Sequence, residues 1–178
     1  MSFKNILCFG TLNPDLIYFV DELPTKGGDI RSLKSSMRPG GTAINCSELI
    51  SLWKKSVQVR GNSIGNDPMG KYLVDYLKEN NINFDGLIIN QSLTPTCSIF
   101  VDSSGERTIV SSGYEGLEWS NFENLNNFDS LIIDRYSIRF IKDKLKDLKK
   151  QNSLFVCQAG YEYLSLIHIS EPTRPDYI

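Results

Sequence analysis

MRPGGTAIN, residues 37–45, places two glycines between a proline and the predicted first turn of a helix. Apolar side chains follow at helical spacing and predict a helix from about Thr42 to Lys54, with one face made of Ala43, Cys46, Leu49, Ile50 and Trp53. Glycines at a helix entry let another group approach the backbone closely. The question that decides how this chain works is which group that is.

Two phosphate-binding loops are excluded by local chemistry. A Walker loop ends in Lys-Ser or Lys-Thr, and GGTAIN (residues 40–45) contains no lysine. A dinucleotide fingerprint needs Gly-x-Gly-x-x-Gly after the first strand, but Gly10 is followed by TLNPD. Gly40 and Gly41 therefore serve either a neutral polyhydroxyl ligand or a plain tight turn, and the pair alone favours the turn.

The pattern along the chain predicts strands that alternate with helices. Apolar runs closed by turn residues predict strands at 3–10, 57–61, 84–90, 128–134 and 153–158. Asp67 is a good N-cap and Pro68 suits the first helical position, so a second helix begins there. Helical spacing also predicts a helix over 137–150, with a solvated lysine face. This order implies an α/β fold with a doubly wound, mostly parallel sheet.

Two β-rich segments do not alternate with helices. They cover about 16–38 and 94–112, and the second reads as a hairpin over 96–113 around the turn SSGE. We expect them to form a small separate β-sheet that projects from the main one.

Composition places the chain among ordinary globular proteins. Its 178 residues suit one domain, and a net charge of −2 gives no reason to expect a nucleic acid or membrane partner. The cysteines, at 8, 46, 97 and 157, form no metal-binding spacing and are expected to be reduced, buried thiols, which fits a cytoplasmic protein. No apolar run is long enough for a signal peptide or a membrane span.

Four segments occur in an order that is typical of one family. They are GTLNPDLIYFVDELPTKGG (10–28), RPGGTAINCS (38–47), GNSIGNDPMGKYLVDYLKENNI (61–82) and TPTCSIFVDSSGERT (94–108). Together they resemble the N-terminal half of the ribokinase/PfkB carbohydrate kinases, from about residue 5 to about residue 160. The family signature Gly-Gly-x-x-x-Asn is among them.

The resemblance assigns a substrate site. Asn13 and Asp15 match ligands of the substrate hydroxyls, Gly40 and Gly41 match the pair that lets a sugar approach the backbone, and Asn45 matches a helix asparagine that reaches a hydroxyl. The β-rich segments match a lid over the sugar, which also offers a surface for a homodimer. A carboxylate and two amides are suitable partners for vicinal hydroxyls.

Some positions depart from the family pattern. Ribokinases place a lysine and a glycine after the glycine pair, where this chain has Thr42 and Ala43, so ribose is in doubt as the substrate. Asp134 and Arg135 occupy a place where the family often presents a further substrate contact. A surface pair at a strand end is an equal alternative for them.

The resemblance implies ATP-dependent phosphorylation of a sugar hydroxyl, with ATP and Mg²⁺ bound by the C-terminal half. There a Gly-Ala-Gly-Asp-like motif supplies the anion hole and the base. This chain has no such motif, so it is expected to carry the sugar-binding half of a longer kinase, with no catalytic residue and no tight binding of ATP or Mg²⁺. Alternatives are a nucleoside kinase of the same fold, or a non-catalytic sugar-binding or dimerisation module.

The C-terminal segment differs from the rest. SLIHISEPTRPDYI (165–178) has two prolines and no usable period, and resembles a translated sequencing adapter. The alternative is an ordinary polar tail. We therefore expect a partial ribokinase-like domain over 1–164 and a tail, artefactual or disordered, over 165–178.

Overall fold

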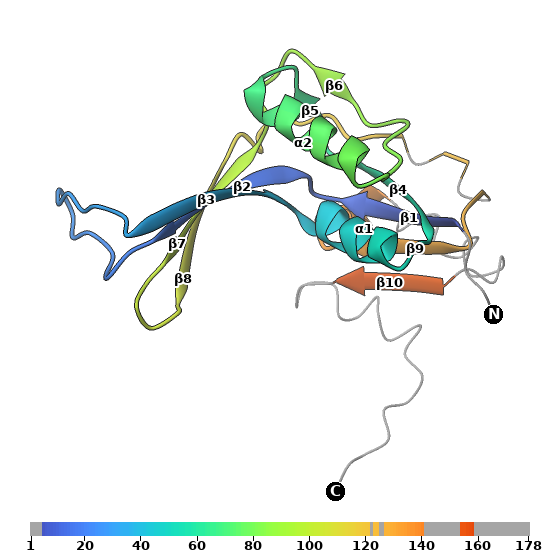
Figure 1. Cartoon of the computed structure of the whole chain (residues 1–178). Coiled ribbons are helices and arrows are strands. Elements are labelled where there is room, and N and C mark those ends of the chain that lie inside the picture. The colour runs from blue at the N-terminus through green and yellow to red at the C-terminus, as the bar shows by residue number, and fades with distance from the viewer. Residues whose placement is uncertain (1–4, 122, 125–126, 141–153, 159–178) are drawn as a thin grey trace, which may run out of the picture.

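A computed structural model of the chain describes residues 5–121, 123–124, 127–140 and 154–158 (Figure 1). The main sheet has four parallel strands in the order β10 (Leu154–Gln158), β9 (Ser130–Asp134), β1 (Asn5–Gly10) and β4 (Ser56–Gly61). Strand β1 lies inside the sheet, and Leu7, Cys8 and Phe9 are buried. A parallel strand that is covered on both faces needs such a continuous apolar run. The predicted α/β class is confirmed.

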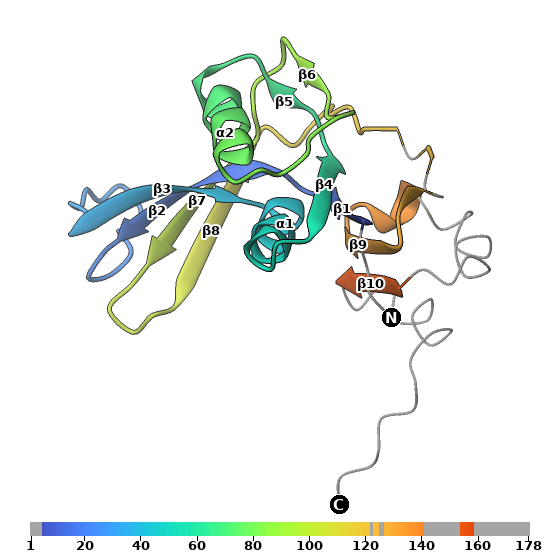
Figure 2. The ribbon, with the colours of Figure 1, turned by 45° about the vertical axis from the view of Figure 1, so that its right-hand side comes forward.

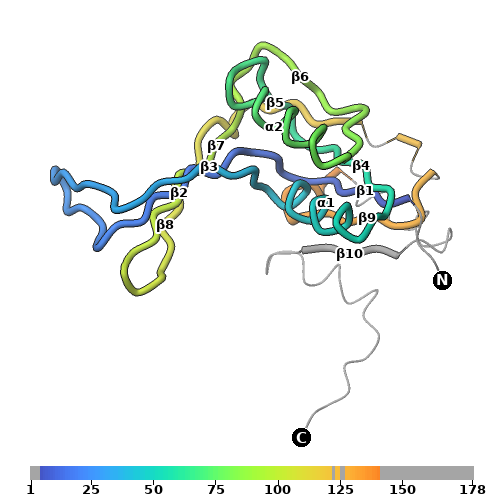
Figure 3. Tube along the Cα trace, in the orientation of Figure 1, coloured from blue at the N-terminus to red at the C-terminus, as the bar shows by residue number. Residues whose placement is uncertain are grey.

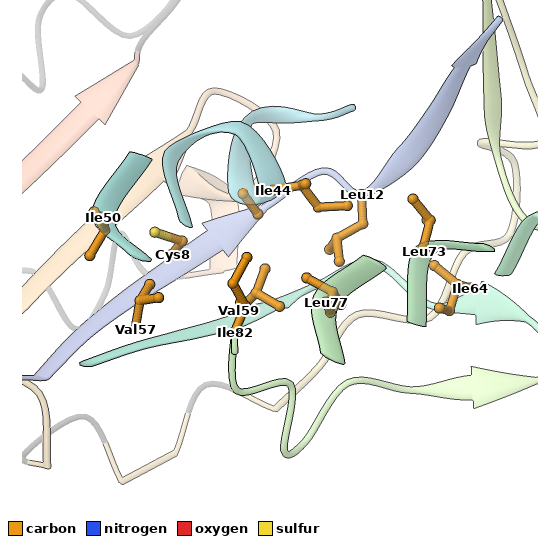
Figure 4. Close-up of a cluster of buried hydrophobic side chains, with 11 residues drawn as sticks. Cys8, Leu12, Ile44, Ile50, Val57, Val59, Ile64, Leu73, Leu77 and Ile82 are labelled. Atoms are coloured by element: carbon orange, nitrogen blue, oxygen red, sulfur yellow. The ribbon is translucent and has the colours of Figure 1, made fainter. Parts of the chain in front are cut away.

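Two helices share one core on this sheet (Figure 4). Helix α1 (Thr42–Leu52) contributes Ile44 and Ile50, and helix α2 (Pro68–Glu79) contributes Leu73 and Leu77. These side chains pack with residues of β1, β4, β5 (Ile64–Gly65) and the neighbouring loops, namely Cys8, Leu12, Val57, Val59, Ile64 and Ile82. Figure 2 shows α1 lying between the main sheet and the projecting strands, so the start of this helix is held near both.

The start of α2 follows its local sequence. Asp67 Oδ1 accepts a hydrogen bond from the Gly70 amide at 2.8 Å, and Pro68 is the first helical residue. This is the predicted cap.

The buried face of α1 is only partly the predicted one: Ala43 and Ile50 are buried as predicted, but other positions differ. Leu49 is 56% exposed and Trp53 is 71% exposed, while Ile44 and Ser47 are fully buried. The Ser47 hydroxyl donates to the Ile44 carbonyl at 2.9 Å, which satisfies this polar group inside the core. Because α1 carries apolar residues around much of its circumference, the sequence period did not fix which side faces the sheet.

Four further strands form a second sheet, here called the lid sheet. Its order is β3 (Lys34–Gly40), β2 (Asn13–Phe19), β7 (Thr96–Val101) and β8 (Arg107–Ser112). Strand β2 runs antiparallel to β3 and parallel to β7, and the hairpin predicted over 96–113 is present as β7 and β8. Figure 3 shows this sheet extending away from the layer of α1, α2 and β1.

One predicted strand is much shorter than expected. Of residues 84–90, only Ile89–Asn90 form a strand, β6, which pairs with β5 (Ile64–Gly65). Gly86 has φ +84°, and the Leu87 amide donates to the Phe84 carbonyl at 3.0 Å. A positive φ ends a strand, so this apolar run turns before it can pair.

Two predictions concern residues outside the described ranges. Of the helix predicted over 137–150, the structure describes Ile138–Phe140, which form the 3₁₀ helix η2. Residues 141–150 and the tail 165–178 lie outside the described part of the chain. Among the helices that are described, none is long and apolar enough to cross a membrane.

Candidate substrate site

The residues assigned by the resemblance meet where β1 passes into β2 and β3 passes into α1. They are Asn13, Asp15, Gly40, Gly41 and Asn45, here called the Asp15 site. In the β2–β3 ladder Asn13 is the register partner of Gly40, which brings the two segments together. The site thus lies at the C-terminal end of a parallel strand and at the start of a helix, where α/β folds commonly place ligands.

Asp15 is half-buried and held by its neighbour. Asn13 Nδ2 donates to Asp15 Oδ1 at 2.7 Å, as alternation along an extended strand requires for residues two apart. Burial raises the pKa of Asp15 above its ordinary value of 3.8, and the hydrogen bond from Asn13 partly offsets this. Asn13, which the resemblance also assigned to a substrate hydroxyl, is only 2% exposed, and its amide nitrogen instead orients the Asp15 carboxylate from within the protein.

Gly40 gives the Asp15 carboxylate its place. A Cβ built on Gly40 would overlap the carboxylate carbon and both carboxylate oxygens of Asp15. Any other residue at 40 would therefore displace the group that the resemblance assigns to the substrate.

Gly41 is required by backbone geometry. It is the N-cap of α1 with φ +86°, and it makes no side-chain cap hydrogen bond. A Cβ there would overlap the Thr11 carbonyl and lie 3.0 Å from Asn13 Oδ1. The tight turn is present at Gly41, and the group that approaches its backbone is the Thr11 carbonyl of the protein itself. The approach of a sugar to the glycine pair stays a prediction.

Asn45 lies near the start of α1. Its amide donates to the Gly41 carbonyl at 3.0 Å, and its side chain is exposed. An exposed carboxamide one turn from Gly41 is free of the core and can donate and accept hydrogen bonds.

Asp134 has a different role from both that were predicted. It is 1% exposed, so it is neither a surface residue nor open to a substrate. Its carboxylate accepts five hydrogen bonds, from the amide and hydroxyl of Thr11, the amide of Tyr136, and the amide and hydroxyl of Ser137, at 2.7–3.0 Å. Asp134 therefore ties the end of β9 to the end of β1. Arg135 is exposed, with its guanidinium 4.7 Å from the centre of the Tyr136 ring.

Thr11 is a residue that the sequence did not single out. Its hydroxyl donates to Asp134 at 3.0 Å and accepts from the Thr42 amide at 3.3 Å, and its carbonyl accepts from the Ala43 amide at 3.2 Å. It therefore satisfies amides at the start of α1 that no side-chain cap reaches. The only sequence signal was a hydroxyl residue directly after Gly10.

Two more side chains lie on the Asp15 face of the lid sheet. Cys97 is the register partner of Asp15 on β7, and the Tyr114 hydroxyl lies 3.5 Å from Cys97 Sγ. The sequence predicted these strands but not their register. Cys97 and Cys46 are half-buried free thiols and Cys8 is a buried one, so among the three cysteines whose burial the structure describes, full burial is confirmed for Cys8 alone.

We assign none of the described residues as a ligand of a nucleotide or of its metal ion. Within the ranges that the structure describes, no three His, Cys, Asp or Glu side chains come together in a way that could hold a metal ion. We therefore assign no contact with ATP or Mg²⁺ to these residues and derive no step through them.

Comparison with known proteins gives a consistent result. The family model described as pfkB family carbohydrate kinase matches residues 4–157. Mouse ketohexokinase is 30% identical over 112 residues, which are 62% of this chain and 37% of that protein. The chain thus aligns with well under half of the length of this relative.

Solved structures share the fold. Arabidopsis thaliana ribokinase, complexed with ribose and ATP, superimposes with a TM-score of 0.69 at 18% identity, covering 88% of this chain and 53% of that one. A nucleoside kinase of the ribokinase family from Methanocaldococcus jannaschii gives a TM-score of 0.70 at 21% identity, covering 91% and 54%. With the family match over most of its length, this chain belongs to the PfkB family of carbohydrate kinases.

Proposed function

We propose that this chain supplies the sugar-binding side of an ATP-dependent carbohydrate kinase, with Asp15 as the acceptor of two substrate hydroxyls. The observation that carries the proposal is the arrangement of Asp15 over Gly40 with Asn13 holding one carboxylate oxygen at 2.7 Å. A half-buried carboxylate whose orientation is fixed can bind hydroxyls without first losing side-chain entropy.

Each residue has a distinct part in this proposal. Asp15 accepts hydrogen bonds from adjacent hydroxyls, Asn13 orients it, and Gly40 and Gly41 let the sugar lie against the backbone. Asn45 contacts a further hydroxyl from α1. ATP would supply the phosphoryl group, and we assign no catalytic base to this chain.

Titration calorimetry with D-ribose and D-fructose tests the site. Charge-assisted hydrogen bonds contribute about 1.5–3 kcal/mol each, so Asp15→Ala is expected to weaken sugar binding by about 10- to 100-fold. Because Asp15 is half-buried and accepts a hydrogen bond from the buried Asn13 amide, Asp15→Ala is also expected to lower the unfolding free energy, by about 0.5–1.5 kcal/mol. Asp29→Ala removes the same charge from an exposed position between β2 and β3 and should bind as wild type. Unchanged sugar affinity in Asp15→Ala, together with a lower melting temperature, would leave Asp15 with a structural role only.

The same titrations separate the sugar kinase from its alternatives. Adenosine is added as a third ligand, because a ribokinase-family nucleoside kinase shares the fold. Binding of adenosine in preference to both sugars would favour a nucleoside kinase. A non-catalytic sugar-binding module would bind sugar, and extending the chain with a C-terminal half from a PfkB kinase would yield no turnover.

We also propose that two lid sheets pair in a homodimer. Apolar side chains are exposed on both faces of the sheet, including Phe19 and Ile109 on the Asp15 face and Met37 and Val110 on the other. Such patches are typical of interaction surfaces. Ile109→Lys should shift a dimer to monomer in sedimentation equilibrium, while Asp29→Lys, outside the strands, should not. A monomeric wild type would contradict the pairing.

The free thiols Cys8, Cys46 and Cys97 support a cytoplasmic location, where such cysteines stay reduced.

A further inference from the structure

Tyr114 returns to the lid sheet after β8 has ended. The chain leaves β8 at Ser112 and turns at Gly113, which has φ +76°. A Cβ on Gly113 would lie 3.1 Å from Pro95 Cα, so this turn is packed against the start of β7. Because Gly113 has a positive φ and is packed against Pro95, the backbone direction at the next residue, Tyr114, is fixed.

The turn places the Tyr114 phenol beside Cys97. Its oxygen lies 3.5 Å from Cys97 Sγ, which in turn lies 3.4 Å from Ser111 Oγ. Cys97 pairs in register with Asp15 on the neighbouring parallel strand, so both side chains project from the same face of the sheet. Tyr114 therefore lies over the face that carries the Asp15 carboxylate.

Electrostatics agrees with this position. Burial raises the pKa of Tyr114 most, the hydrogen bond and charge of Cys97 add to it, and the charges of Asp15 and Tyr136 act in the same direction. The phenol is thus protonated at neutral pH and can donate a hydrogen bond. Tyr136 approaches from the main sheet, where its amide donates to Asp134 at 3.0 Å.

We propose that Tyr114 is a specificity-determining residue, whose hydroxyl binds a sugar hydroxyl next to Asp15 and whose ring limits how bulky the ligand can be. The inference rests on the proposed sugar site. It predicts a small polyhydroxyl ligand that bridges a carboxylate and a phenol, in preference to a bulkier nucleoside.

The test compares three variants of the full chain with the wild type by calorimetry, using D-ribose, D-fructose and adenosine. Tyr114→Phe keeps the ring and loses one hydrogen bond, so sugar affinity should fall by about 3- to 10-fold with an unchanged melting temperature. Tyr114→Ala should weaken the sugars further and lower the ratio of sugar affinity to adenosine affinity by about 10-fold or more. Tyr18→Phe, on the opposite face and stacked on Phe100 at 5.4 Å, is the control and should match wild type.

The outcomes are distinguishable from failure of the site itself. If Asp15→Ala weakens sugar binding but both Tyr114 variants keep the wild-type affinities and their ratio, only the assignment of Tyr114 is overturned. If Asp15→Ala has no effect, or the wild type binds none of the three ligands, the sugar site is overturned and the assignment of Tyr114 with it.

Discussion

Single residues at the Asp15 site are fixed by what surrounds them. At Gly40 there is no room for a side chain, because the Asp15 carboxylate occupies that volume. At Gly41 the constraint is double, since φ is +86° and the Thr11 carbonyl lies where a Cβ would be. The two glycines are therefore needed for different reasons, and only the reason at Gly40 concerns the Asp15 carboxylate directly.

Substitution of Gly41 separates strain from crowding. Gly105, in the β7–β8 turn, also has φ +86°, but nothing lies within 4 Å of its Cβ position. Gly105→Ala should lower the unfolding free energy by about 1–2 kcal/mol from backbone strain alone. Gly41→Ala should cost about 1–3 kcal/mol more, because its Cβ also crowds a backbone carbonyl. Urea unfolding measures both, and equal losses would show that crowding at Gly41 is relieved.

The raised pKa of Asp15 predicts a pH dependence of stability. The folded chain binds this proton more tightly than the unfolded chain, so the contribution to the unfolding free energy is fully present below pH 3.8. It is lost as the pH rises from 3.8 through the raised pKa. Asp15→Asn should flatten the stability curve in that window, while Asp29→Asn should leave it as in wild type. Parallel curves of unfolding free energy against pH for wild type and Asp15→Asn would contradict a raised pKa of Asp15.

At the scale of elements, α2 is tied to the lid sheet by its own cap. Asp67 Oδ1 accepts from the Gly70 amide at 2.8 Å and from the Thr94 hydroxyl at 2.7 Å, and Oδ2 accepts from the Thr94 amide at 2.8 Å. The Thr94 hydroxyl also accepts from the Gly65 amide at 2.9 Å. One carboxylate therefore joins the start of α2, the end of β5 and the approach to β7.

Removal of this cap should cost more than removal of an ordinary surface carboxylate. Asp67→Ala is expected to lower the unfolding free energy by about 1–3 kcal/mol, from a lost cap and from the unpaired Thr94 groups. Asp75→Ala, on the exposed side of the same helix, should stay within about 0.5 kcal/mol of wild type. Chemical denaturation measures the unfolding free energy of both variants. Equally small losses in Asp67→Ala and Asp75→Ala would mean that water replaces the hydrogen bonds of the cap.

At the scale of the whole molecule, we expect the chain to bind sugar but not to catalyse phosphoryl transfer. The sequence has no Gly-Ala-Gly-Asp-like motif to supply an anion hole and a base. Loss of both should remove many orders of magnitude of rate, so the 178-residue chain is expected to bind sugar without turning it over. A coupled ADP-release assay over hexoses, pentoses and nucleosides measures this. Robust turnover by the pure protein would contradict it.

What the sequence determined by itself is local. The cap at Asp67, the apolar run of β1 and the alternation of Asn13 and Asp15 all depend on neighbours within a few residues. The order of strands and helices then indicated the α/β class and the lid sheet. These features were predicted because each depends on the chemistry of side chains that are close together in the sequence.

What only the tertiary structure decided depends on contacts between distant segments. Asp134 is buried with its carboxylate satisfied, and two of its hydrogen bonds come from Thr11, 123 residues away, which a sequence pattern at a strand end cannot show. Tyr114 reaches the Asp15 face through the register of β2 on β7. The buried side of α1 was chosen by the sheet that it covers, since an apolar period fits more than one rotation of a helix. Burial and register are properties of the packed molecule, because each is set by groups that meet only when the chain has folded.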